Sequence, residues 1–121
     1  MTERPRVLLA DDHPGVLKAI GRLLSFDCEV VAMVSDCTAA LESTARFRPD
    51  VVVMDVSMPD IGGLEACRRI TQSSPGVKVI LVSAAERHSI QRVGLAAGAF
   101  AVIAKEEVAD QLMPAISSSL R

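Results

Sequence analysis

The feature that most constrains the fold is a run of four apolar residues, Val51 to Met54, that ends in the carboxylate Asp55. An uninterrupted apolar run is typical of a strand buried on both faces, as in a parallel sheet with helices on each side. A carboxylate at the end of such a strand adds nothing to packing. In open α/β sheets, ligands bind in the crevice outside the carboxyl ends of the strands. Asp55 is therefore a candidate site residue.

A second acidic site has the same form, because Asp11 and Asp12 directly follow the apolar run 7–10. If both strands belong to one sheet, three carboxylates converge on one crevice. Like charges at short range repel one another strongly, and oxygen ligands suit a divalent cation. The sequence thus predicts a cation site at this edge of the sheet.

Five apolar runs alternate with five segments of helical period. Strands are expected over residues 6–10, 29–34, 51–55, 77–82 and 99–103, and helices over 15–25, 37–47, 64–73, 86–97 and 107–119. Pro14 fits the first turn of the first helix, and Ser35 or Asp36 can cap the second. Strict βα alternation with short connections predicts right-handed crossovers and a parallel sheet. The expected fold is α/β, a flavodoxin-like (βα)5 three-layer sandwich of strand order 2-1-3-4-5, whose first and third strands meet at the switch point.

Composition narrows the class of protein. The chain has 121 residues, half of them apolar, without Trp or Tyr, and a net charge of −2, which argues against a nucleic-acid-binding face. No apolar stretch approaches the length of a membrane span, and the N-terminus does not resemble a signal peptide, so a cytoplasmic protein is expected. Cys28, Cys37 and Cys67 lack metal-binding spacing and are expected to be reduced thiols.

Two further strand ends carry polar side chains that should reach the same crevice. Ser83 closes the run 77–82, and Lys105 follows the apolar residues 102–104. Three carboxylates, a hydroxyl and an ammonium suit phosphoryl transfer, in which catalysis is mostly positioning and charge stabilisation. One carboxylate can attack phosphorus and form an acyl phosphate, while the others hold Mg²⁺.

In combination, these residues resemble the receiver domain of bacterial two-component response regulators. The matching positions are Asp11-Asp12, Asp55 with Met58-Pro59 and Gly62-Gly63, Ser83-Ala84, and Lys105. The resemblance covers essentially the whole chain. The start at Asp12-His13-Pro14 and the stretch 49–70 resemble the subgroup whose receivers precede a LuxR-type helix-turn-helix domain.

The resemblance implies a role for each matching residue. The implied phosphoryl-transfer residues are the phosphoacceptor Asp55 together with Ser83 and Lys105, and the backbone N–H groups of Ser57 and Ala84 would also contact the phosphoryl group. The implied Mg²⁺ ligands are Asp12 directly, Asp11 mainly through water, Asp55, and the carbonyl of Ser57. Ser57 and Ala85 would flank the path of the water that removes the phosphate.

The implied function is a phosphorylation-dependent switch that receives its phosphoryl group from a sensor histidine kinase. It is not an enzyme, since it assists only its own phosphorylation and dephosphorylation. Residues 1–121 would be a receiver excised from a longer chain with a C-terminal DNA-binding domain. This receiver would dimerise on phosphorylation and contact neither nucleic acid nor membrane itself.

The sequence departs from the family pattern in two places. Val102 stands where the family usually has Tyr or Phe, and its side chain is too small for the usual switch by a rotating ring. Glu106 stands where many relatives have a proline after the lysine, often in a cis peptide, and a trans bond is expected here. The resemblance implies an output face formed by the fourth helix, fifth strand and fifth helix. Phe100 is either buried under the fourth helix or part of an apolar patch on this output face. His13 is expected to be a loop residue near the site.

Two other functions compete with the switch. A pseudo-receiver, a protein-interaction module independent of phosphate, is favoured by the missing aromatic and opposed by the intact acidic set. A phosphatase of the haloacid dehalogenase type would need Asp-x-Asp after the first strand and a cap, and neither is present. A nucleotide-binding fold lacks the glycine patterns it requires.

Overall fold

The computed structural model describes residues 4–84 and 87–121. Five parallel strands form one sheet of order β2-β1-β3-β4-β5, as predicted. The strands are β1 (Arg6–Ala10), β2 (Glu29–Val34), β3 (Val51–Asp55), β4 (Lys78–Ser83) and β5 (Ala101–Ala104). The helices are α1 (Pro14–Leu24), α2 (Cys37–Phe47), α3 (Gly63–Ser73), α4 (Arg87–Ala96) and α5 (Val108–Ser119), with a 3₁₀ helix η1 (Lys105–Glu107) before α5.

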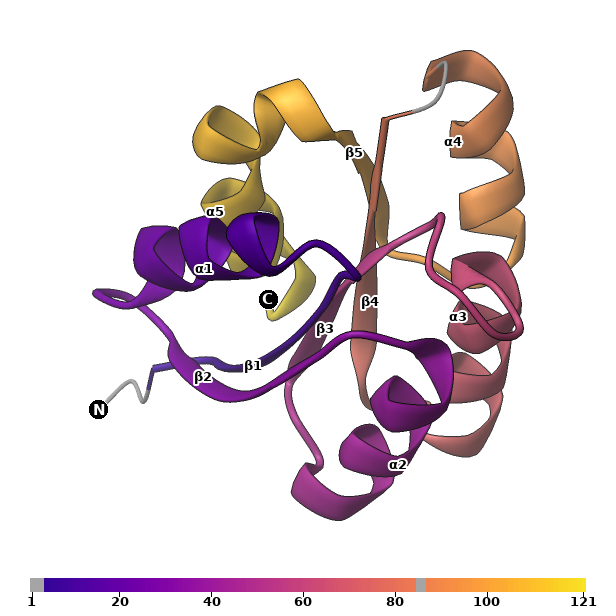
Figure 1. The fold of residues 1–121 in the computed structure, drawn as a ribbon, viewed down its shortest axis with the longest axis horizontal. Helices are drawn as coiled ribbons and strands as arrows, with labels where there is room; N and C mark the ends of the chain where they lie inside the picture. Colours follow the sequence, from indigo (N-terminus) through magenta and orange to yellow (C-terminus); the bar gives the residue numbers. More distant parts are fainter. Residues whose placement is uncertain (1–3, 85–86) are drawn as a thin grey trace.

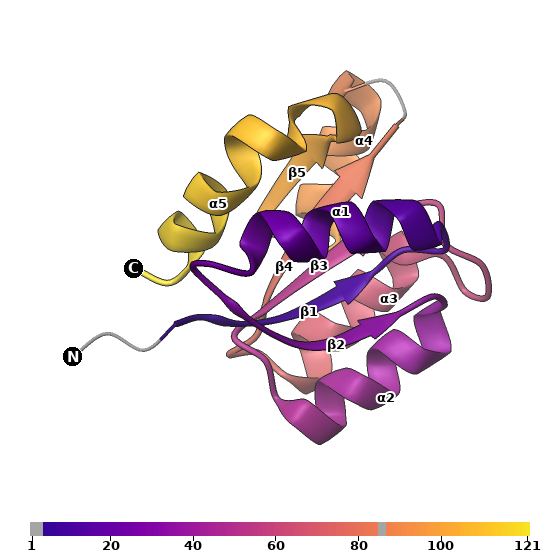
Figure 2. The ribbon, with the colours of Figure 1, turned by 60° about the vertical axis from the view of Figure 1, so that its left-hand side comes forward.

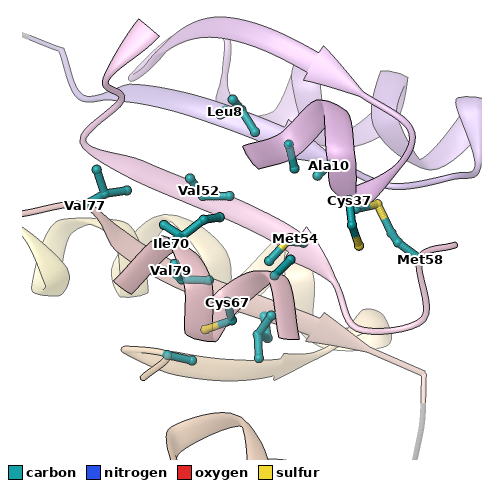
Figure 3. Close-up of a cluster of buried hydrophobic side chains, with 14 residues drawn as sticks. Leu8, Ala10, Cys37, Val52, Met54, Met58, Cys67, Ile70, Val77 and Val79 are labelled. Atoms are coloured by element: carbon teal, nitrogen blue, oxygen red, sulfur yellow. The ribbon is translucent and has the colours of Figure 1, made fainter. Parts of the chain in front are cut away.

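The helices cover both faces of the sheet. α1 and α5 lie on one face, and α2, α3 and α4 lie on the other (Figures 1 and 2). The apolar run of β3 supplies both interfaces, because all five of its residues are buried. Val52 and Met54 pack toward α2 and α3 (Figure 3), while Val51 and Val53 pack toward α1 and α5. This two-sided burial explains why β3 lacks the alternation of a half-exposed strand.

Local signals set most helix boundaries as the sequence predicted. Pro14 occupies the first turn of α1, and the Asp36 carboxylate accepts a hydrogen bond from the Ala39 backbone N–H at 2.7 Å. Asp36, and not Ser35, therefore caps α2. The expected start of the fourth helix at residue 86 lies outside the described residues. Across the described residues, no helix combines the length and apolar character needed to cross a bilayer.

The fifth strand is shorter than predicted, because it begins at Ala101 and not at residue 99. Gly98 has a φ of 105°, and the Ala99 N–H donates to the Gly94 carbonyl at 3.1 Å. Residues 98 and 99 thus terminate α4, as glycine in the left-handed region commonly does, instead of extending the sheet. The fourth strand is shifted by one residue and includes Ser83. No described peptide bond is cis, in agreement with the trans bond expected at Glu106.

Candidate functional site

The acidic crevice lies where β1 and β3 end side by side. Ala10 is in register with Met54, so Asp11 and Asp55 follow directly after a paired position. Both aspartates are only 3% exposed, whereas Asp12 points toward solvent. Charged groups buried to this degree must be paired or must bind a cation, because desolvation of an isolated carboxylate is costly. The two buried carboxylates therefore require positive charge nearby.

Lys105 supplies part of the compensating charge. Its Nζ lies 3.4 Å from Asp55 Oδ2 and 3.6 Å from Asp11 Oδ2, and its side chain is 25% exposed. β5 ends at Ala104, and the turn into η1 directs the lysine back across the carboxyl ends of β3 and β1. One ammonium between two buried carboxylates leaves uncompensated negative charge, to which Asp12 adds. This charge balance fits a divalent cation.

The other predicted site residues surround Asp55 on the chain segments that follow β3 and β4. The Ser57 backbone N–H donates to Asp55 Oδ1 at 3.2 Å, so this donor already points at the carboxylate. Ser83 is buried at the end of β4 and is in register with Ala104, next to Lys105. Ala84 is exposed beyond it, and Ala85 lies outside the described residues. The structure thus brings together polar groups from the ends of β1, β3, β4 and β5.

His13 lies closer to the carboxylates than the sequence suggested. Its backbone N–H donates to Asp11 Oδ1 at 2.9 Å, and its Nδ1 lies 3.2 Å from Asp12 Oδ1. Among the described residues, Asp11, Asp12 and His13 form one group whose potential ligand atoms lie within 4.8 Å of one another. Adjacency to Asp11 and Asp12 in the sequence does not determine where the His13 ring points, because that depends on the backbone conformation after β1.

The loop after β3 is tied to α2 by Asp60, a residue that the sequence analysis did not single out. Asp60 has a φ of 79°, and its Oδ2 accepts hydrogen bonds from Thr38 Oγ1 at 2.8 Å and from the Thr38 N–H at 3.2 Å. Asp is among the few residues that tolerate this backbone region. The sequence does indicate a turn here, because Asp60 lies between Pro59 and Gly62-Gly63 and such clusters of Pro, Asp and Gly form turns. Asp60 thereby positions the loop that carries Ser57.

Replacing Asp60 by alanine should lower the free energy of unfolding by about 1–2 kcal/mol, because two hydrogen bonds at the start of α2 are lost and alanine disfavours positive φ. Asp60→Gly is the matched control, since glycine adopts this φ without strain and isolates the hydrogen-bond contribution. Urea unfolding of the three proteins measures both effects. Equal midpoints for all three would show that the Asp60–Thr38 contact does not hold this loop.

The three cysteines are packing residues. All three are unpaired and buried, as the sequence predicted. Burial raises the pKa of the Cys37 thiol, with an opposing contribution from the Gly62 backbone N–H and further increases from Asp60, Asp36 and Asp55. Figure 3 shows Cys37 beside Met58 in the cluster between the sheet and α2. Burial raises the pKa of Cys67 to about 11, so that thiol is not a nucleophile at neutral pH either.

Val102, at the position of the usual aromatic switch, packs directly under α4. A Cβ added to Gly94 would lie 2.6 Å from Val102 Cγ2. Because Gly94 has no side chain, α4 can pack this closely on β5. Phe100 lies just before β5 and is 43% exposed, which places it partly on the surface and not fully under α4.

A doubly wound parallel sheet of this strand order, with an acidic crevice and a lysine at its switch point, is a flavodoxin-like domain. Comparison with known families agrees with this class. The family described as the response regulator receiver domain matches residues 7–117, and the chain belongs to this family. It is the receiver domain of a two-component response regulator, a signalling domain and not a classical enzyme.

The relatives are response regulators about twice as long. MprA of Mycobacterium leprae is 35% identical over 116 residues, which cover 96% of this chain and 51% of MprA. GacA of Pseudomonas aeruginosa is 39% identical over 114 residues, which cover 92% of this chain and 53% of GacA. The chain thus spans about half the length of these curated relatives.

Solved structures agree with the predicted fold. The signal receiver domain of NarL from Mycobacterium tuberculosis has a TM-score of 0.91 at 28% identity, covering 97% of this chain and 96% of that one. A LuxR-family response regulator from Aurantimonas sp. SI85-9A1 also has a TM-score of 0.91, at 30% identity, covering 98% of this chain and 86% of that one. Receiver domains interact with histidine kinases and generally bind Mg²⁺ in their acidic pocket.

Proposed function

We propose that this domain accepts a phosphoryl group on Asp55 from a sensor histidine kinase, in the presence of Mg²⁺, and thereby switches an output. The observation that carries the proposal is the placement of Asp55. Its carboxylate is buried at the end of β3, 3.4 Å from the Lys105 ammonium and one strand away from Asp11 and Asp12. A nucleophile held between a cation and a cation-binding acidic pair is the arrangement that phosphoryl transfer requires.

The reaction forms one bond and breaks one. An Oδ atom of Asp55 attacks phosphorus to form an acyl phosphate, while the P–N bond to the kinase histidine breaks and the imidazole nitrogen keeps the electron pair. Lys105, 3.4 Å from Asp55 Oδ2, would stabilise the oxygens of the transferring group, and the Ser57 N–H, which donates to Asp55 Oδ1, would bind them as well. Ser83 and the N–H of Ala84 complete the set at the end of β4. Mg²⁺, when bound, neutralises charge on the carboxylates and on the phosphoryl group.

The donor set fits Mg²⁺ because every proposed ligand is an oxygen. These ligands are the carboxylates of Asp11, Asp12 and Asp55 and the carbonyl of Ser57, with Asp11 acting mainly through water. Mg²⁺ prefers carboxylate, carbonyl and water oxygens and retains several waters. The charge left uncompensated by Lys105 supports the same assignment.

The direct test exposes the chain to acetyl phosphate, a small phosphodonor, with and without Mg²⁺. One phosphoryl group per chain should be added only with Mg²⁺, as measured by intact mass. An unmodified chain under both conditions would favour the pseudo-receiver, the competing function that Val102 supports.

Mg²⁺ should also stabilise the unphosphorylated fold. A ligand that binds only the native state adds RT ln(1 + [L]/Kd), which is roughly 2.7 kcal/mol at one hundred times Kd. For a chain of this size, each 1 kcal/mol raises Tm by roughly 3–6 °C. Thermal unfolding with MgCl₂, against NaCl of equal ionic strength, measures the increase. The increase should shrink in Asp12→Ala, and a wild type indifferent to Mg²⁺ would contradict a shared cation site.

The output belongs to the same proposal. Relatives of about twice this length support the proposal that residues 1–121 are the receiver of a longer regulator. The resemblance to receivers that precede a LuxR-type domain suggests that the remaining part binds DNA. Val102 is too small to act as a rotating ring, and its contact with Gly94 leaves α4 closely packed on β5. Phosphorylation would therefore act on the output face through shifts in packing and backbone near the start of α4, with dimerisation as the readout.

A further inference from the structure

His13 places a nitrogen atom beside the acidic crevice. The proposed phosphoryl transfer has no role for this nitrogen. Its Nδ1 lies 3.2 Å from Asp12 Oδ1 and 3.6 Å from Asp11 Oδ1. The imidazole is 69% exposed, so it can reorient at little cost. His13 is also the N-cap residue of α1, yet its side chain makes no capping hydrogen bond. The ring is therefore not committed to the helix.

The separations are close to those of ligands that share one metal ion. Two ligand atoms about 2.1 Å from one cation and at right angles to each other lie about 3 Å apart. At a tetrahedral angle, atoms at about 2.0–2.1 Å lie slightly farther apart, at about 3.3 Å. The two distances from Nδ1 to the carboxylates, 3.2 and 3.6 Å, need only small adjustments to reach either geometry.

The chemistry of the added atom changes which metal the crevice prefers. Mg²⁺ takes oxygen ligands, whereas imidazole suits later transition metals such as Ni²⁺ and Zn²⁺, which bind nitrogen and oxygen sites more tightly in general. A crevice with oxygen donors alone would favour them less. A nitrogen ligand beside Asp11 and Asp12 should therefore increase the affinity for Ni²⁺ or Zn²⁺ relative to the affinity for Mg²⁺.

We propose that His13 is a metal-specificity residue: it ligates a transition-metal ion held by Asp11 and Asp12, and it contributes little to Mg²⁺. Such an ion competes with Mg²⁺ for the crevice and so links transition-metal level to phosphorylation. The inference rests on the proposed function, because the same aspartates serve both ions. The alternative is that His13 only pairs with Asp12 at the surface.

Calorimetric titration of the untagged chain with Ni²⁺ and with Mg²⁺ separates these readings. In His13→Ala, the Ni²⁺ affinity should fall at least about tenfold relative to the Mg²⁺ affinity, since even indirect support of a ligand is worth 10–100-fold. His88→Ala removes the only other histidine in the chain and is the matched control, which should keep the wild-type ratio. Asp12→Ala should lower the affinity for both ions.

Pulsed EPR with Mn²⁺ gives a readout that a structural role would not change. Nitrogen modulation from a bound imidazole should be present in the wild type and in His88→Ala and absent in His13→Ala. An unchanged Ni²⁺ to Mg²⁺ ratio in His13→Ala, or nitrogen modulation that persists in it, would overturn the assignment while Mg²⁺ binding and phosphorylation remained. If the wild type itself did not bind Mg²⁺ in this titration, the proposed function would be overturned instead.

Discussion

Replacing Asp55 by asparagine should abolish phosphorylation while leaving the fold intact. Asparagine has nearly the same shape but lacks the anionic oxygen that attacks phosphorus, and no acyl phosphate can form on an amide. The substitution also removes one of two buried carboxylates that share a single lysine, so stability should not fall greatly. The loss of labelling should therefore be complete and not the result of unfolding.

The measurement is intact mass, or a phosphate-retarding gel, after incubation with acetyl phosphate and Mg²⁺. The chain has no Trp or Tyr whose fluorescence could report the reaction. Asp110→Asn is the matched control, because Asp110 is an exposed aspartate in the first turn of α5 that is not among the proposed site residues, and this variant should be labelled like the wild type. Labelling of Asp55→Asn at the same stoichiometry would place the phosphoacceptor elsewhere.

Replacing Gly63 by alanine should be strongly destabilising, by about 2–4 kcal/mol. A Cβ at this position would lie 2.5 Å from the Asp55 carbonyl oxygen and 2.7 Å from Val56 Cα. Both are backbone atoms, so the methyl group can be accommodated only if α3 moves away from the end of β3. The same movement would disturb the phosphoacceptor, so the rate of phosphorylation should also fall.

Gly15 offers the matched control for this substitution. A Cβ at Gly15 meets nothing within 4 Å, and its backbone is not in the left-handed region. Gly15→Ala should therefore cost nothing, because alanine is the better helix former. Urea unfolding of both variants gives the comparison. If Gly63→Ala were as stable as Gly15→Ala, the contact between α3 and β3 would be looser than the structure indicates.

Local patterns were sufficient for the architecture. The apolar run of β3, the βα alternation and the short connections together predicted a parallel sheet, because burial on two faces and crossover handedness leave few alternatives. The expected order 2-1-3-4-5 is one of the two common orders of such sheets. The same logic located the crevice, since the carboxyl ends of parallel strands share one edge. The membership in the receiver family followed from the residues at those strand ends. Even the cap of α2 at Asp36 was a local choice between two adjacent residues.

The details within the crevice required the tertiary structure. Lys105 lies 50 residues from Asp55, and only the turn into η1 decides that its ammonium reaches two carboxylates. Asp60 meets Thr38 across 22 residues, and the start of β5 depends on how Gly98 ends α4. These contacts depend on where elements distant in sequence approach one another. The sequence by itself therefore determined the elements, their order and the chemical types at the crevice, whereas three-dimensional packing alone decided which of those groups touch.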